Sequence, residues 1–235
     1  MPRAGAEPGM SGIVFIISAP SGSGKSTLVK ELRKFVRHLE FSVSFTTRPP
    51  RGSERDGEEY HFISRGQFED MIARGEFLEH AEVFGQYYGT AKSVLHDAER
   101  RGNDLLLDID VQGERQVKGK VPEAVSIFVL PPSRAELESR LRKRSQSENM
   151  VSQEVIQRRL AAARKEIENY PNYDYILIND RLEQSVDDLQ AVVLGERAQR
   201  SGKPLSPQDR QYLDTAQKCL KSRMEGKIQS ILASF

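Results

Sequence analysis

The chain has 235 residues, of which 37% are hydrophobic and 29% are charged, and its formal net charge is +1 at pH 7. This length suits one domain, or one domain with a small insertion. The near-neutral charge argues against long nucleic acid or a membrane surface as partner, and no apolar run reaches the ~18 residues of a membrane span. The single cysteine, Cys219, excludes an intrachain disulfide framework and favours a cytoplasmic location.

The first ten residues lack a hydrophobic signal core, and we expect them to form a disordered tail. Residues 13–17 are apolar in succession, which is typical of a strand buried on both faces. A loop of small residues leads from there into a segment where Leu28, Leu32 and Phe35 share one helical face. A strand, a small-residue loop and a helix start in this order are typical of a loop that cradles nucleotide phosphates.

The loop contains the residue types that phosphate binding requires. Gly22 and Gly24 let the backbone approach phosphate oxygens because they carry no Cβ atom. Lys25 supplies a cation for the β- and γ-phosphates, and the Ser26 hydroxyl is placed to ligate Mg²⁺. Ala19 stands where the strict motif has glycine, and a glycine-rich turn with an unrelated lysine is the alternative. The flanking strand and helix favour nucleoside triphosphate binding by Ala19, Pro20, Ser21, Gly22, Ser23, Gly24, Lys25, Ser26 and Thr27.

Residues 41–46 alternate apolar and polar side chains and predict a strand, and a short strand is expected around residues 60–62. Between them, a Pro-Pro pair favours polyproline II. Arg48 and Arg51 would then lie on the same side, roughly 9 Å apart, which suits two cations closing on one phosphate. Ser64 and the glutamine three residues on form a capping-box pattern that predicts a helix.

Residues 77–84 have strand composition, residues 85–89 are expected to turn the chain back, and residues 92–101 look helical. Residues 104–110 predict a second buried strand that ends in acids. An acid at this place in a phosphate-loop enzyme holds Mg²⁺ or its water, and a helix-capping aspartate is the alternative. We expect the metal role for an acid at the end of this strand.

Residues 125–130 and 173–178 predict two more buried strands, and a helix is expected over residues 182–199. Strands that alternate with helices after a phosphate loop indicate a parallel α/β sheet with right-handed crossovers. Residues 42–90 are strand-rich and indicate an inserted lobe.

Two basic helices flank a polar segment at residues 145–152. The first follows a capping-box pattern at Ser133 and places Arg140 and Arg144 on one face. The second, over about residues 151–168, carries Arg158 and Arg159. This arrangement suggests a mobile lid over phosphates, and a solvated charged surface is the alternative.

Residues 201–206 read as a linker. Beyond them, apolar residues at helical spacing predict a helix from about Pro207 to Ile231. We expect its apolar stripe to pack on a partner subunit, giving a homo-oligomer, or back on the core.

These motifs together resemble the guanylate kinase family. They follow in that family's order and cover roughly residues 11–198: Ser-Ala-Pro-Ser-Gly-Ser-Gly-Lys-Ser at 18–26, then residues 43–52, 77–81, 87–89, 107–113 and 178–180. The resemblance implies the reaction ATP + GMP ⇌ ADP + GDP with Mg²⁺, and dGMP as a further acceptor. The implied fold is a P-loop nucleoside-monophosphate-kinase core, with a parallel sheet flanked by helices, a strand-rich GMP-binding lobe and a helical lid.

The resemblance also implies domain limits. The guanylate kinase domain would take residues 11–200. It leaves the tail at residues 1–10, which composition indicates, and a C-terminal helical extension at residues 201–235, about which the resemblance says nothing. Within the domain, the core takes residues 11–41 and 91–200, the lobe about 42–90 and the lid about 140–160.

Site residues follow from the same motifs. The resemblance implies GMP binding by Ser44, Arg48, Arg51, Tyr60, Glu79, Tyr88, Thr90, Asp108 and Gly113. It implies a role in phosphoryl transfer for Lys25, Arg48, Arg140, Arg144 and Arg159, a place beside the adenine for Asn179, and Mg²⁺ binding by Ser26 and, through water, Asp110. The lid segment at residues 144–156 is longer than usual and Ser145 replaces a glycine, so Arg158 stays an alternative to Arg159.

Two other functions remain to be weighed. One is a protein-interaction module of the same fold whose nucleotide site has decayed, which would need neither Lys25 nor metal ligands. The other is a kinase for a different nucleoside monophosphate. Glu79 favours guanine, because a carboxylate accepts the adjacent N1–H and N2–H₂ donors that adenine lacks. Glu82 is the nearest rival for that role.

Overall fold

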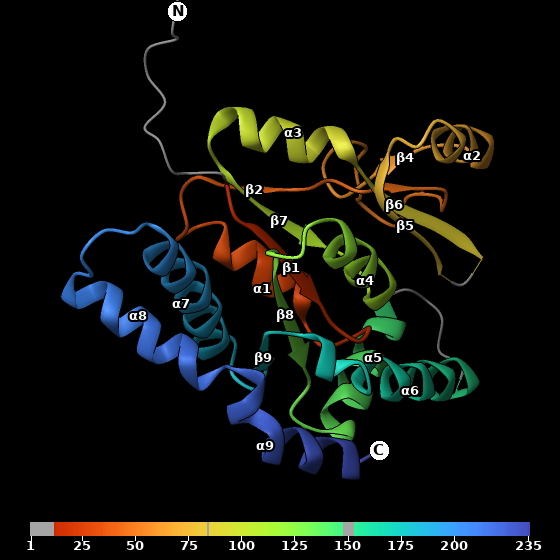
Figure 1. Cartoon of the computed structure of the whole chain (residues 1–235). Helices are drawn as coiled ribbons and strands as arrows, with labels where there is room; N and C mark the ends of the chain where they lie inside the picture. The colour runs from red at the N-terminus through yellow and green to blue at the C-terminus, as the bar shows by residue number, and fades with distance from the viewer. Residues whose placement is uncertain (1–11, 84, 148–152) are drawn as a thin grey trace, which may run out of the picture. The chain divides into compact units, whose positions relative to one another are not determined.

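The computed structural model describes residues 12–83, 85–147 and 153–235, with the backbone alone for residues 144–147 (Figure 1). The chain forms two units. Of the described residues, one unit combines residues 12–15 with those in His38–Ala124, and the other combines Ile16–Arg37 with those in Val125–Phe235. The division falls inside strand β1 (Val14–Ser18), the first strand of a five-stranded sheet with the order β2-β7-β1-β8-β9.

The strands of this sheet are built from apolar runs. All of β1 and β8 (Val125–Leu130) is buried, and so is nearly all of β7 (Asp104–Asp108) and β9 (Tyr175–Ile178), as expected for strands covered on both faces. The strand β2 (Leu39–Phe41) pairs with β7, and β8 pairs with β9, both in parallel register. The prediction of a parallel α/β sheet is confirmed.

A second sheet of four strands lies in the first unit, with the order β4-β3-β6-β5. Its members are β3 (Phe45–Thr46), β4 (His61–Phe62), β5 (Phe77–Val83) and β6 (Gln86–Ala91). The strands β5 and β6 form an antiparallel hairpin. The expected single strand at residues 41–46 is wrong, because the chain changes partners within it: the Ser42 N–H donates to Leu106 O, whereas Ser44 O accepts from the His61 N–H.

The expected turn at residues 85–89 is also wrong beyond Gly85. That residue has a φ of 79° and lies in the connection, but the next four residues already belong to β6. Gly89 serves close packing instead of a turn, because a Cβ atom there would lie 2.9 Å from Phe77 Cδ1 and 3.0 Å from Phe68 Cζ.

The described residues of the first unit form three helices. The helix α2 (Arg65–Ala73) starts with the predicted capping box of Ser64 and Gln67, and α3 (Lys92–Arg101) coincides with the predicted helix. The sequence analysis did not anticipate α4 (Val111–Lys120). This helix packs against β5, where the Gln116 amide bonds both the N–H and the carbonyl of His80.

The second unit contains α1 (Lys25–Leu32), α5 (Arg134–Ser147), α6 (Gln153–Ile167), the 3-10 helix η1 (Tyr170–Asn172) and α7 (Leu182–Arg200). Leu28 and Leu32 are fully buried, as expected. Phe35 is not on their face: it lies past the end of α1 and is 58% exposed. The helix α7 packs against α1 and β9.

The segment beyond α7 forms two helices, α8 (Pro207–Lys218) and α9 (Lys221–Ala233), in place of the single helix predicted. The break has a cause in the sheet. Cys219 O accepts from the Ile176 N–H at 2.8 Å, and the Lys221 N–H donates to Asp174 O at 3.1 Å, so the junction adds to the edge of β9. In Figure 1, α8 runs along α7. The apolar stripe of the extension packs back on its own unit, with Ala216, Met224, Ile228 and Ile231 buried.

Candidate active site

The loop between β1 and α1 has the geometry that its glycines predict. Gly22 and Gly24 have φ angles of 93° and 89°, in the left-handed region that favours glycine. The Ser23 N–H donates to the Pro20 carbonyl at 3.1 Å and closes a turn. The helix α1 begins at Lys25, so the loop ends at a helix N-terminus, which favours a bound anion.

Two side chains that are distant in sequence converge on the carbonyl oxygen of Ser23. Asn179 Nδ2 donates to it at 2.8 Å and Arg140 Nη1 at 3.3 Å, while Arg140 Nη2 donates to Asn179 O at 2.9 Å. Asn179 is buried, and a Cβ atom on Gly24 would lie 2.4 Å from its Nδ2 atom. The structure thus brings Arg140 and Asn179 to the predicted phosphate loop.

Arg140 is held on its own helix as well. Its Nε donates to Glu136 Oε1, one turn earlier in α5, at 2.8 Å. Leu137 and Leu141 lie against the phosphate loop, because a Cβ atom on Gly22 would meet Leu141 Cδ2 at 2.9 Å and Leu137 Cδ1 at 3.0 Å. Ion pair and packing together fix the direction in which α5 presents the Arg140 guanidinium.

The other predicted lid arginines are less fully described. Arg159 is partly buried on α6 and Arg158 is exposed, which favours Arg159 as the inward-facing residue. The side chain of Arg144 lies outside the described part of the structure, as do residues 148–152 of the predicted lid.

In the first unit, four of the predicted GMP-binding residues meet in one buried cluster. Thr90 Oγ1 donates to Glu79 Oε1 at 2.7 Å and lies 3.3 Å from Ser44 Oγ. Glu79 is 3% exposed, Thr90 is fully buried and Ser44 is 8% exposed. A Cβ atom on Gly113 would lie 2.6 Å from Glu79 Oε2, so glycine is required where α4 approaches the carboxylate.

Opposing effects act on the pKa of the Glu79 carboxyl group. The pKa of Glu79 is raised to about 7: burial and the nearby Asp110 carboxylate raise it, whereas the Thr90 hydrogen bonds and Lys120 lower it. The side chain therefore changes its charge near neutral pH. A buried carboxylate with a shifted pKa is a frequent mark of a functional site.

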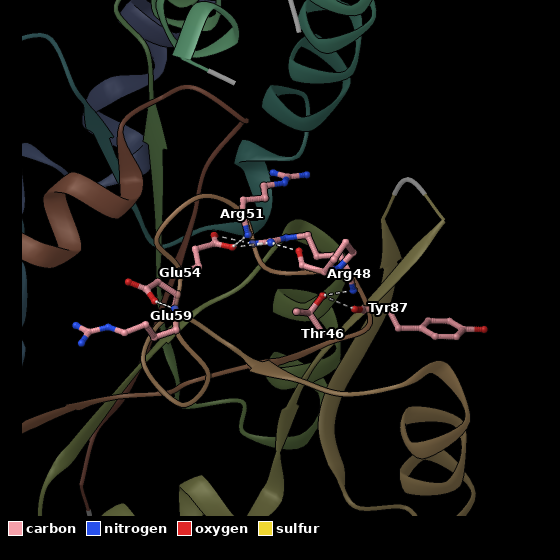
Figure 2. Close-up of polar contacts among 8 residues, drawn as sticks. Thr46, Arg48, Arg51, Glu54, Glu59 and Tyr87 are labelled. Atoms are coloured by element: carbon pink, nitrogen blue, oxygen red, sulfur yellow. Dashed lines mark hydrogen bonds and ion pairs between the residues drawn. The ribbon is translucent and has the colours of Figure 1, made fainter. Parts of the chain in front are cut away.

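Arg48 lies in an enclosed polar cluster (Figure 2). Its Nη1 and Nη2 atoms donate to the two carboxylate oxygens of Glu54 at 2.7 and 2.8 Å, and Nη1 also donates to Pro49 O at 2.9 Å. Arg48 is 7% exposed, and its guanidinium carbon lies 5.0 Å from the centre of the Tyr60 ring. The hydrogen bond to Glu54 raises the pKa of Arg48. Nε and the second N–H of Nη2 lie on the same edge of the guanidinium and form the side-on fork suited to a phosphate.

The remaining members of the predicted phosphate site lie around Arg48. The Tyr60 and Tyr88 rings are in edge contact, with centroids 5.8 Å apart. The backbone of Arg48 is fixed by Thr46, whose Oγ1 accepts from the Arg48 N–H and donates to the Tyr87 carbonyl. Arg51 is exposed, and Figure 2 shows its side chain directed away from the Arg48–Glu54 pair, while its backbone N–H donates to Glu54 Oε2.

The acids that follow β7 have different positions. Asp108 ends the strand and is partly buried. Asp110 caps α4, since its Oδ1 accepts from the N–H groups of Gln112 at 3.0 Å and Gly113 at 2.8 Å. Helix capping, which was the alternative to metal binding, is thus present at Asp110. Mg²⁺ binding by Asp110 stays a prediction. In the described residues, no group of three His, Cys, Asp or Glu side chains is arranged to hold a metal ion.

Sequence reasoning missed the two acids that orient the arginines. Glu54 holds Arg48 and Glu136 holds Arg140. Glu54 stands in a polar loop and no pattern distinguishes it from its neighbours. The spacing of Glu136, four residues before Arg140 on a helix, is a signal that points to the pair. No helix in the described residues is long and apolar enough to cross a membrane.

Comparisons with known proteins identify the family of this chain. The sequence model of the guanylate kinase family matches residues 11–196. A guanylate kinase of Koribacter versatilis is 58% identical over 96% of this chain and 97% of its own length, and one of Alkalilimnicola ehrlichii is 47% identical over 80% and 91%. The crystal structure of guanylate kinase from Anaplasma phagocytophilum has a TM-score of 0.67 and 33% identity, covering 80% of this chain and 87% of that one. This chain therefore belongs to the guanylate kinase family and has its P-loop nucleoside-monophosphate-kinase fold.

Proposed function

We propose that the chain transfers the γ-phosphoryl group of ATP to GMP, forming ADP and GDP, and that dGMP is a second acceptor. The buried cluster of Glu79, Thr90, Ser44 and Gly113 carries this proposal, because an ionised Glu79 would pair with the two adjacent donors of guanine. Adenine would leave the carboxylate facing an acceptor nitrogen, a mismatch that can cost about 10⁴–10⁵ in specificity.

Different residues bind the two substrates. The loop from Ala19 to Thr27 holds the ATP phosphates, Lys25 neutralises the transferring group, and Asn179 lies beside the adenine. Arg48, Arg51, Tyr60 and Tyr88 hold the GMP phosphate, and Asp108 contributes to the guanine side. During transfer, the negative charge on the phosphoryl group is stabilised by Arg140, Arg144 and Arg159. The acceptor is already an anion, so positioning and charge stabilisation are sufficient and no strong general base is needed.

Mg²⁺ is the proposed cofactor, and the chemistry of the predicted ligands suits it. Mg²⁺ prefers hard oxygen donors and keeps several of its waters. Ser26 offers an exposed hydroxyl in the first turn of α1, and Asp110 Oδ2 has one hydrogen bond, from Gln112 Nε2 at 3.3 Å. When bound, Mg²⁺ would neutralise phosphate charge. Chelation should abolish turnover, and added Mg²⁺ should restore it.

The core, lobe and lid limits given above stay part of the proposal. The four-stranded sheet of β3 to β6 supports a GMP-binding lobe at about residues 42–90. A cytoplasmic location is supported by the single, buried Cys219. Association through the C-terminal helix would have to use its exposed face, since the apolar stripe is already covered within the chain.

An acceptor panel tests the activity. ADP release should be fast with GMP, slower with dGMP, and near background with AMP, UMP and dTMP. Lys25→Ala should abolish turnover while circular dichroism and melting temperature stay unchanged, because the variant removes a cation for the transition state. A chain that binds neither nucleotide but captures a protein ligand would support the interaction-module alternative.

A further inference from the structure

The C-terminal segment formed by α9 and residues 234–235 lies outside the residues matched by the family model. It contacts the start of α5 and the chain just after α6, and we call these two helices the arm. At the start of α5, Ser234 Oγ accepts from the Arg134 N–H at 3.0 Å. After the end of α6, the Tyr170 hydroxyl donates to Glu225 Oε1 at 2.6 Å and accepts from Gln229 Nε2 at 3.1 Å. One segment thereby joins the two ends of the arm.

The Ser234 contact has consistent donors and acceptors. Its hydroxyl donates to Ile231 O at 2.6 Å, which leaves the oxygen lone pairs free to accept from Arg134. The amides in the first turn of any helix lack partners within that helix, so an acceptor there stabilises the helix start. Ser133 caps the same turn by accepting from the Glu136 N–H at 3.2 Å.

Phe235 reaches the interior of the arm. The arm is held together by a buried cluster of Leu137, Leu141, Ile156, Leu160 and Ala163, and Phe235 packs against this cluster. Leu137 and Leu141 also lie against Gly22 of the phosphate loop. Packing is therefore continuous from α9, through the arm cluster, to the loop that receives the ATP phosphates.

The arm carries Arg140, which bonds the Ser23 and Asn179 carbonyls. We propose that Ser234 and Phe235 are positioning residues for phosphoryl transfer, which hold α5 so that Arg140 and the phosphate loop keep their mutual geometry. A displacement of about 1 Å is enough to cost a large factor in rate, because the reacting groups must be aligned. The inference rests on the proposed function, since it assigns Arg140 to the transferring group.

Buried side chains hold α9 against the sheet independently of its contacts with the arm. Met224, Ile228 and Ile231 are buried, and the helix packs against β9. A substitution at Phe235 or Ser234 therefore removes the contact to the arm without removing the buried stripe. This separation makes the proposal testable with point variants of the full chain.

The experiment compares Phe235→Ala, Ser234→Ala and their double variant with the unmodified chain. The double variant should lose about tenfold in kcat, while the KM for GMP stays unchanged because the arm cluster includes none of the residues proposed to bind GMP. Phe235→Leu and Ser234→Thr, which retain an apolar group and a hydroxyl, should restore most of the rate. Phe35→Ala removes an exposed phenylalanine of the same unit and is the matched control, expected to leave kcat unchanged.

Hydrogen exchange separates this proposal from the proposed function. Amides of residues 134–141 should exchange faster in the double variant than in the unmodified chain, whatever the substrate proves to be. A double variant with a lowered melting temperature but unchanged kcat and unchanged exchange in α5 would overturn the positioning role. An unmodified chain without GMP phosphorylation, but with the faster exchange in the variant, would instead contradict the proposed function alone.

Discussion

Glu79 controls the charge of the proposed guanine pocket near neutral pH. Its pKa is raised to about 7 by burial and by Asp110. The ionised carboxylate accepts two donors from guanine, whereas the protonated acid turns one acceptor into a donor. We therefore expect the KM for GMP to rise about tenfold for each pH unit below about 7, with little change in the KM for ATP. Steady-state kinetics across this pH range measures the effect.

Glu79→Gln and Glu82→Gln are the paired variants for this test. Glu79→Gln should have a high KM for GMP that no longer depends on pH. Glu82, on the same strand but exposed, should tolerate the change and keep the original profile. The reverse pattern would move the guanine contact to Glu82 and contradict this description of the pocket.

The same carboxylate links stability to pH. The pKa of Glu79 in the folded chain is above its ordinary value of 4.5, so the folded state holds the proton more tightly than the unfolded state. Its contribution is fully present below 4.5 and is lost as pH rises through about 7, with an upper limit of about 3 kcal/mol. Glu79→Gln should therefore gain stability over the unmodified chain at about pH 8, by urea unfolding, and less so at about pH 5.

The ion pair between Arg48 and Glu54 is expected to matter for GMP binding. Burial alone would raise the pKa of Glu54, but hydrogen bonds from Arg48 and the Arg51 amide outweigh it and lower that pKa. Glu54→Gln should raise the KM for GMP about tenfold, because the guanidinium loses its orienting partner. Arg48→Lys should be nearly as damaging as Arg48→Ala, since lysine cannot form a fork.

Glu58→Gln is the matched control for Glu54→Gln. Glu58 pairs with Arg55 in the same loop, but both side chains are well exposed, so the pair contributes little. Equal effects of the two glutamine variants on GMP kinetics would contradict a specific role for Glu54.

Gly113, in the first turn of α4, lies against the Glu79 carboxylate, so a side chain at this position would displace Glu79. Gly113→Ala should raise the KM for GMP strongly, because the added Cβ atom would lie 2.6 Å from Glu79 Oε2. Gly119→Ala, in the same helix and with open space around it, should instead stabilise the chain by about 1 kcal/mol and leave the KM unchanged. Chemical denaturation and kinetics on both variants distinguish a close contact from a general effect on the helix.

Sequence patterns predicted the elements that depend on residues close together in the sequence or on a continuous apolar run. Buried strands, the capping box at Ser64 and the phosphate loop depend on apolar runs and short spacings, and the structure has them. The strand change at Ser42 and the use of Gly89 under two aromatic rings depend on contacts between distant segments. For the same reason, motif resemblance predicts roles for Arg48 and Glu79, whereas the ion pair of Glu54 with Arg48 is found only in the structure.

At the scale of the whole chain, α8 and α9 complete the second unit. Leu213 and Ala216 lie against Gly195 of α7, with a Cβ atom there 3.4 and 3.5 Å from them, and the α8–α9 junction adds to the edge of β9. A truncation after Ser201 should therefore lower the melting temperature. Light scattering on the same sample tests whether the oligomeric mass changes as well.

Cys219 reports whether this junction opens in the full chain. The thiol is 5% exposed, and burial, with Asp188 nearby, raises its pKa to about 12. Because the thiolate is the reactive form, modification by a disulfide reagent at neutral pH should be slow. Lys221→Pro removes the N–H that donates to Asp174 O, yet proline suits the first residue of a helix, so labelling should become about fivefold faster with α9 intact. Lys221→Ala keeps that N–H and should label at the original rate. A thiol that reacts in the unmodified chain as fast as a free cysteine would show that the junction is open in solution.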